Sequence, residues 1–306
     1  MQRLSTSNDG IRGSLSLIPN SDYQDQLDFK RNIIVKAFRR YFGSESTTVP
    51  EIDHTHPSPL QYGYRTKITP HFEVPRSKGK DGPGEIPDTI GFVEKGRKRL
   101  VDIEECVIAR PSLNIGLAKE RAIVKQKHYK RGATLLLREA DDTTAATGDS
   151  EEIPKKYITD HKQIITEHVN EFKFEFPAGM SFTSLHLSVL GSFFQNNNSI
   201  LPGFTGYVHD QIEASFQELD LLDQPRFLVD AYCGSGLFSV TCSRGFESVI
   251  GVEITAESVK YAVHNAKANN IANAKFITGS ADRIFDVVHT PPDHTAVIID
   301  PPRKVC

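Results

Sequence analysis

A chain of 306 residues, 38% of them hydrophobic and 25% charged, has the composition of a globular protein with about two domains. No apolar run approaches the ~18 residues of a membrane-spanning helix, and the N-terminal residues lack the apolar core of a secretory signal. The net charge of −3 gives no general attraction to nucleic acid, so any such binding must come from local basic patches.

The four cysteines lie far apart in the sequence. They show neither a disulfide framework nor the spacing of a zinc site, so we expect an intracellular, reducing compartment and no bound metal. The sequence does not choose between cytoplasm, nucleus and mitochondrion, and it leaves the oligomeric state open.

The first half of the chain predicts a mixed α+β portion. Apolar residues at steps of three and four predict a helix over 25–42, with Gly43 as its stop. The acidic, Thr/Ala-rich stretch 140–154 is aperiodic and typical of an exposed, flexible loop. The other elements expected here are strands over 62–74 and 89–94, a helix over 111–125 and a strand over 133–138.

The second half alternates short apolar strands with helices, which is typical of βαβ units and a parallel sheet. We therefore predict an α/β protein, with a Rossmann-like domain over 192–306 after an α+β portion over 1–191. The strands are expected at 227–231, 248–252, 274–278 and 296–299, and the helices at 202–222, 237–244 and 257–269.

A glycine-rich turn after the first of these strands predicts a nucleoside-bearing cofactor. Gly234 and Gly236 let backbone N–H groups approach a ligand, and Glu253, at the end of the next strand, can accept hydrogen bonds from both ribose hydroxyls. Ser239 stands where a dinucleotide fingerprint has its third glycine, which a pyrophosphate needs. The pattern favours S-adenosylmethionine, with NAD or FAD as the alternative.

The Asp-Pro-Pro-Arg motif over 300–303 leaves the last strand at its carboxyl end, where open α/β sheets bind ligands. Its prolines stiffen the turn and would hold Asp300 and Arg303 over the reactive end of the cofactor. A plain proline stop with a capping aspartate is the alternative. Asp282 either contacts the adenine amine or caps a helix.

Several motifs in order resemble those of the RNA uracil-C5 methyltransferases, most closely the fungal-type tRNA (uracil-5-)-methyltransferases. The resemblance implies S-adenosylmethionine as the cofactor and tRNA as the partner, without membrane or metal. The matching motifs are 58–72, 101–106, 130–138, 193–202, 230–238 and 300–304. The positions that match the family's cofactor-binding residues are Gln195, Tyr232, Glu253 and Asp300.

The implied reaction is methyl transfer to C5 of a T-loop uridine in tRNA. In that chemistry a cysteine thiolate adds to C6 and makes C5 nucleophilic, and a base then removes the C5 proton. The target base must leave its stack to reach the pocket. A methyltransferase acting on ribosomal RNA or on an exocyclic amine is the alternative.

The family's nucleophilic cysteine and general base lie beyond the Asp-Pro-Pro-Arg motif, and this sequence stops at Cys306. We therefore predict no catalytic residue in the chain as given and expect it to be inactive, an RNA- or cofactor-binding fragment. Cys306 is expected to be a frayed terminal thiol. Relative to the family, the chain also looks truncated at its N-terminus and carries an apparent insertion over 180–191. Retained intron sequence would explain such features.

Three basic clusters predict RNA contacts in the first portion. Phosphate contacts from such groups dock RNA without selecting a sequence, and a solvated basic surface is the alternative for each. The clusters are Lys119–Arg131, with Lys119, Arg121, Lys125, Lys127, Lys130 and Arg131, then 95–99, and the pair Arg65 and Lys67.

Overall fold

The computed structural model describes residues 22–43, 51–74, 84–94, 97, 99–142, 154–178 and 195–301. The chain divides into two compact units. The predicted boundary between 191 and 192 lies outside the described residues, and so does the apparent insertion over 180–191; both stay predictions. The first unit comprises Met1–Gln61, Thr69–Val107 and Leu117–Leu135, and the second Tyr62–Ile68, Ile108–Gly116 and Leu136–Cys306.

Helix α2 (Tyr23–Phe42) of the first unit corresponds to the helix predicted over 25–42. It begins at Asp22, whose carboxylate accepts a hydrogen bond from the Asp25 backbone N–H at 2.8 Å. It ends at Gly43, which has a φ of 90° that glycine adopts without strain.

The first unit also holds a small antiparallel sheet in the order β4-β3-β2-β5. Phe72, Ile90 and Val124 form its buried core. The strand predicted over 62–74 is interrupted near Pro70, because proline cannot donate a ladder hydrogen bond. The strands are β2 (His71–Phe72), β3 (Ile90–Val93), β4 (Leu100–Asp102) and β5 (Ala133–Thr134), and helix α3 (Pro111–Val124) contributes residues to both units.

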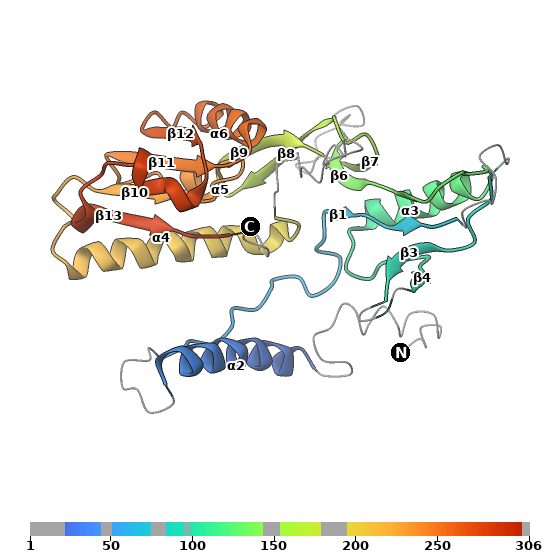
Figure 1. Cartoon of the computed structure of the whole chain (residues 1–306), viewed down its shortest axis with the longest axis horizontal. Helices are drawn as coiled ribbons and strands as arrows, with labels where there is room; N and C mark the ends of the chain where they lie inside the picture. Colours follow the sequence, from blue (N-terminus) through green and yellow to red (C-terminus); the bar gives the residue numbers. More distant parts are fainter. Residues whose placement is uncertain are drawn as a thin grey trace. The chain divides into compact units, whose positions relative to one another are not determined.

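A four-stranded parallel sheet in the order β12-β11-β10-β13 dominates the second unit (Figure 1). Both of its faces are covered. Leu228 faces Phe216 and Phe238 of two helices, whereas Val229 faces Ile284 in the opposite layer. The elements are β10 (Phe227–Asp230), β11 (Ser248–Glu253), β12 (Ala274–Thr278), β13 (Thr295–Ile298), α4 (Leu201–Glu218), α5 (Leu237–Thr241), α6 (Ala256–Ala268) and α7 (Ile284–Val287).

The parallel arrangement confirms the predicted Rossmann-like sheet, and each predicted strand lies within one residue of its expected bounds. Three short 3-10 helices join these elements. They are η2 (Asn198–Ile200), η3 (Ala281–Arg283) and η4 (Pro292–His294).

Antiparallel strands in the second unit form a three-stranded sheet in the order β1-β6-β7 and a separate β8–β9 hairpin. The hairpin was not predicted, although Phe172, Phe174 and Phe176 alternate with polar residues as a half-buried strand requires. Asn170, with a φ of 53°, lies in its turn. The strands are β1 (Lys67–Ile68), β6 (Leu137–Asp141), β7 (Lys155–Ile158), β8 (Ile164–Val169) and β9 (Phe172–Pro177).

The loop was predicted over 140–154, and this predicted start is too early. Ala140 is buried, and Ala140 and Asp141 pair with Lys156 and Lys155 as part of β6. These ladder pairs override the loop-like composition. Residues 143–153 lie outside the described residues.

Candidate functional site

The strand order reverses beside β10, because the chain runs from β10 to β11 on one side and returns at β13 on the other. In open α/β sheets, ligands bind at the carboxyl ends of the strands at such a switch point. Asp230 ends β10, Glu253 ends β11, and Asp300 follows the end of β13 by two residues. Tyr232 lies just past β10, partly buried.

The turn after β10 has a backbone that only glycine adopts readily. Gly234 has a φ of 53° and Gly236 a φ of 90°. The Cys233 N–H donates to the Val252 carbonyl at 3.0 Å, and the Gly236 N–H donates to the Cys233 carbonyl at 2.8 Å. The turn is therefore tied to β11 and closed on itself. The predicted approach of its backbone to a ligand stays a prediction.

Glu253 is fixed by two backbone donors. One carboxylate oxygen accepts from the Gly234 N–H at 3.2 Å and the other from the Thr255 N–H at 2.9 Å. Each carboxylate oxygen has two lone pairs, so each retains capacity for one more hydrogen bond. The arrangement holds an acceptor pair against the glycine turn.

Asp230 is a site residue that the sequence-based list omitted. Its side chain is buried, and Oδ2 accepts from the Ser239 N–H at 3.0 Å and from the Ser239 hydroxyl at 2.7 Å. Its Oδ1 is buried and has no hydrogen-bond partner among the residues that the structure describes. Burial, with the added negative charges of Asp300 and Glu253, raises the pKa of Asp230 to about 6. Three carboxylates thus share one electrostatic environment at the carboxyl ends of β10, β11 and β13.

This raised pKa predicts a pH-dependent stability. The contribution of Asp230 is fully present below its unfolded pKa and is lost as the pH rises through about 6. We expect wild type to lose about 2 kcal/mol of unfolding free energy, relative to Asp230→Asn, between about pH 4 and pH 7. Denaturant melts of both proteins measure this difference, and a difference that does not change with pH contradicts it.

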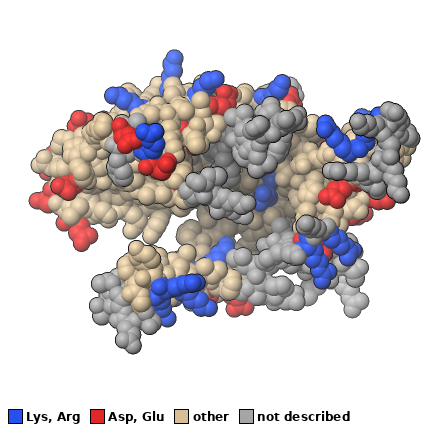
Figure 2. All heavy atoms as spheres, viewed as in Figure 1, with Lys and Arg blue, Asp and Glu red and all other residues tan. Residues whose placement is uncertain are grey.

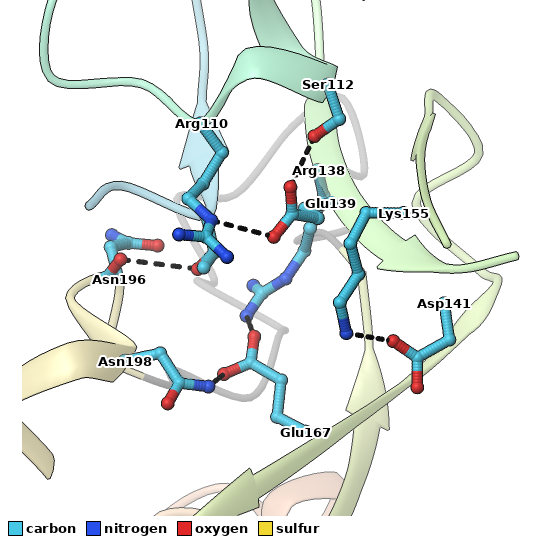
Figure 3. A network of polar contacts seen from close by, with 10 residues as sticks. Arg110, Ser112, Arg138, Glu139, Asp141, Lys155, Glu167, Asn196 and Asn198 are labelled. Carbon is cyan, nitrogen blue, oxygen red and sulfur yellow. Dashed lines mark hydrogen bonds and ion pairs between the residues drawn. The ribbon is translucent and has the colours of Figure 1, made fainter. Parts of the chain in front are cut away.

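The segment that carries Gln195 is positioned by a different set of contacts (Figure 3). The Asn196 carbonyl accepts from the Thr66 N–H at 3.0 Å. The Asn198 amide donates to Glu167 at 3.0 Å, and Glu167 in turn accepts from Arg138 at 3.1 Å. Gln195 itself is partly buried in an extended stretch before η2. Its position is set by this network rather than by the glycine turn.

Buried charge is concentrated in this network. The Arg138 side chain is only 1% exposed and Glu167 is 8% exposed. Burial is the main cause that raises the pKa of Glu167, and Arg138 opposes it. Burial, together with Arg138 and Arg65, lowers the pKa of Lys67 to about 8. Nearby, Arg110 and Ser112 both donate to Glu139 (Figure 3).

Comparison with known proteins matches residues 185–293 to the family model described as tRNA (Uracil-5-)-methyltransferase. The chain is 49% identical over 286 residues to the tRNA (uracil(54)-C(5))-methyltransferase of Schizosaccharomyces pombe, covering 93% of the chain and 49% of that protein. It is 41% identical over 329 residues to the Saccharomyces cerevisiae protein of the same name, with the same coverage. The chain is related to the tRNA (uracil-5-)-methyltransferases. This confirms the resemblance of its motifs.

A solved structure supports the fold. The crystal structure of Pyrococcus abyssi tRNA (uracil-54, C5)-methyltransferase, in complex with S-adenosyl-L-homocysteine, has a TM-score of 0.55 and 21% sequence identity. The match covers 92% of this chain and 68% of the Pyrococcus abyssi chain. The chain spans about half the length of the fungal relatives that it matches.

The basic cluster over 119–131 needs one correction. Arg121 is not available to RNA, because it is buried and donates to both carboxylate oxygens of Asp102, at 2.9 and 2.8 Å, and to the Ile90 carbonyl. The sequence does not indicate the pairing of Arg121 with Asp102, because the two residues are nineteen positions apart. Five other members of the cluster are exposed: Lys119, Lys125, Lys127, Lys130 and Arg131.

The other basic groups differ in their surroundings. Arg97 pairs with Glu94 at 3.4 Å, whereas Lys95 and Lys98 lie outside the described residues. Arg65 donates to the Lys67 carbonyl at 2.8 Å. Figure 2 shows a further gathering of basic side chains on α2, which the sequence reading missed. The exposed basic residues of that helix are Lys30, Lys36, Arg39 and Arg40.

The described cysteines are small packing residues. Cys106, Cys233 and Cys242 are buried thiols. Burial, and then the charges of Asp230 and Glu253, raises the pKa of Cys233 far above its ordinary value. Burial also raises the pKa of Cys242 to about 11. A reactive thiolate needs the opposite environment.

Some sequence-based assignments are placed only in part. Asp282 lies inside η3, after the N-cap Ser280, and its carboxylate accepts from the Ser280 hydroxyl. Its alternative role as a helix cap was therefore wrong, and its contact with the adenine amine stays a prediction. Arg303 and Cys306 lie outside the described residues. Within the described part of the chain, no group of three or more His, Cys, Asp or Glu side chains is placed to hold a metal ion. No helix in that part is long and apolar enough to cross a membrane.

Proposed function

We propose that this chain is the cofactor-binding part of an enzyme that transfers a methyl group from S-adenosylmethionine to C5 of a T-loop uridine in tRNA. The observation that carries the proposal is the 49% identity to a fungal protein named for that reaction at uridine 54. The glycine turn and three carboxylates at the switch point are what such a donor requires.

The residues present fit S-adenosylmethionine. When bound, it supplies an electrophilic methyl group on a positively charged sulfur. The carboxylates of Asp230, Glu253 and Asp300 form an anionic environment that suits a cation. The buried Oδ1 of Asp230 and hydroxyl of Ser235 have no hydrogen-bond partner among the described residues, and a ligand can use them. Ser239 stands at the position of the third glycine of a dinucleotide turn, and its hydroxyl donates to Asp230. The turn therefore lacks that glycine.

We assign the binding roles as the motifs predict. Glu253 would accept from the ribose hydroxyls, and Gly234 and Gly236 would allow the close approach of the donor. The remaining proposed contacts are Gln195, Tyr232 and Asp300. NAD and FAD fit less well, because both carry a pyrophosphate.

RNA docking would rely on the exposed basic residues of the first unit. Lys119, Lys125 and Lys127 follow one another along α3 and the turn after it, and α2 adds further lysines and arginines. Such groups neutralise phosphates and make binding depend on salt. We also propose an intracellular, reducing compartment, which the three buried thiols support.

A catalytically inactive binding protein is the second candidate, and the cysteines favour it for the described residues. The chemistry needs a thiolate near the donor, whereas Cys106, Cys233 and Cys242 are all buried. Donor binding and methyl transfer are therefore separate properties to test.

Two measurements test the proposal. Calorimetry of the chain with S-adenosylhomocysteine tests the site, and we expect a single binding event. Mapping of modified uridines in cells that lack the gene tests the reaction, and we expect loss of the T-loop C5 methyl group in tRNA. Loss confined to ribosomal RNA would favour the ribosomal alternative, and no loss at all would favour the inactive one.

A further inference from the structure

We propose that Asn265 of α6 is a positioning residue for the cofactor site: it holds the glycine turn in its binding conformation and ties that turn to the β8–β9 hairpin. This inference rests on the proposed function, since it assumes that the turn binds S-adenosylmethionine. All the contacts involved lie within the second unit.

The Asn265 side chain makes three hydrogen bonds, which use both N–H donors of its amide and one of the two lone pairs of its oxygen. It is completely buried. Its Oδ1 accepts from the Glu175 N–H at 2.8 Å, and its Nδ2 donates to the Glu175 carbonyl at 3.2 Å and to the Ser235 carbonyl at 2.9 Å. One amide therefore joins α6, the outer edge of β9 and the turn after β10.

A second asparagine, Asn269, is the C-cap of α6, four residues after Asn265, and supplies an internal comparison. Its Oδ1 accepts from the Lys173 N–H at 2.8 Å and its Nδ2 donates to the Lys173 carbonyl at 2.7 Å. Both asparagines thus dock the edge of β9 onto α6 in the same way. Only Asn265 also reaches the glycine turn.

The hydrogen bond from Asn265 to the Ser235 carbonyl matters because Ser235 lies inside the glycine turn. Ser235 is 2% exposed and stands between the two glycines with positive φ. The Gly234 N–H is directed to Glu253 and the Gly236 N–H to the Cys233 carbonyl. With the Ser235 carbonyl directed to Asn265, the peptide groups of the turn have fixed orientations. Loss of the amide would leave a buried acceptor unsatisfied and let the turn adopt other conformations.

The β8–β9 hairpin also contacts the segment that carries Gln195, another proposed cofactor contact. Glu167 on β8 accepts from Asn198, three residues after Gln195. Phe174 and Phe176 of β9 pack in one buried cluster with Val240 of α5 and Ala266 of α6. The β8–β9 hairpin is therefore a common support for the Gln195 segment and the glycine turn. A rigid support of this kind preorganises a site and reduces the entropy lost on binding.

Paired variants test the proposal. Asn265→Ala is expected to weaken binding of S-adenosylhomocysteine about tenfold, and Asn269→Ala by less than about twofold, although both variants should lose Tm. A merely structural role would lower both Tm values but leave the two affinities alike. If wild type binds and both variants bind equally well, the positioning role is wrong. If wild type itself shows no binding, the proposed function fails, and the inference fails with it.

A measurement on wild type covers the case in which Asn265→Ala does not fold. Coupling between two sites is reciprocal. A ligand bound at the glycine turn must therefore also stabilise the hydrogen bonds between Asn265 and Glu175 of β9. Saturation with S-adenosylhomocysteine is expected to slow hydrogen exchange at the Glu175 amide severalfold and to change the Lys173 amide little. Equal protection of the two amides, or protection of neither, would overturn the proposal.

Discussion

Glu253→Ala is expected to weaken the affinity of the chain for S-adenosylhomocysteine by about 100-fold, because the two charge-assisted hydrogen bonds that we propose it accepts from the ribose hydroxyls would be lost. The carboxylate is already held in place by the Gly234 and Thr255 N–H groups, at 3.2 and 2.9 Å. Little of the binding energy is therefore spent on ordering this side chain. Titration calorimetry on the variant and on wild type gives the two affinities.

The control for this experiment is Glu257→Ala, which removes a nearby negative charge without touching the turn. Glu257 lies in the first turn of α6 and pairs with Lys260 at 3.2 Å on the surface. We expect it to change the affinity less than about twofold, because exposed ion pairs are weak. A folded Glu253→Ala protein that binds as tightly as Glu257→Ala would show that Glu253 only shapes the turn.

The parallel sheet was predictable because its signals are local. Each strand is an apolar run of four to six residues bounded by turn residues, and the intervening helices have apolar residues on one face. Gly234 and Gly236 follow the end of β10 and Glu253 ends β11, so their meeting at one edge of the sheet follows from the topology. The order of the strands in the sheet, which locates the switch point beside β10, was not predicted and comes from the structure.

The supporting contacts were not predictable, because their partners lie far apart in the chain. Asn265 and Glu175 are separated by 90 residues, and Arg138 and Glu167 by 29. Arg121 looked like one more member of a basic cluster, yet it is buried against Asp102. Asparagine and arginine are common on exposed helix faces, so composition alone did not mark these residues as buried. Only the alternating phenylalanines of β9 offered a sequence signal for the hairpin.

Asp230 shows how a residue in a recognised motif was still left out of the site. The sequence-based list kept Tyr232 and both glycines from this stretch, and it treated Ser239 only as a missing glycine. In the structure Ser239 donates twice to Asp230, through its backbone N–H and its hydroxyl. The serine therefore has a positive role, since it satisfies one oxygen of a buried carboxylate, whereas the other oxygen has no hydrogen-bond partner among the described residues.

Glu167→Ala is expected to have the largest effect on stability, about 3–5 kcal/mol, because it leaves Arg138 buried without its charge partner. Arg138 is 1% exposed, and its guanidinium otherwise lies over the Phe176 ring at 4.6 Å. The same variant removes the acceptor of the Asn198 amide. The loss should therefore loosen the segment that carries Gln195. Denaturant melts measure the change in unfolding free energy.

Two comparisons distinguish the effect of leaving a buried charge unpaired from the effect of losing any ion pair. Glu171→Ala removes the partner of Arg244 at 3.6 Å, where both side chains are exposed, and it should cost under about 1 kcal/mol. The double variant Arg138→Met with Glu167→Leu removes both charges and should recover much of the stability lost in Glu167→Ala, since apolar replacements of a buried pair are often well tolerated. If the double variant is as unstable as Glu167→Ala, shape rather than unpaired charge explains the loss. If Glu167→Ala costs no more than Glu171→Ala, the pair does not stabilise the hairpin, and other contacts, such as that of Asn196 with Thr66, must hold the Gln195 segment.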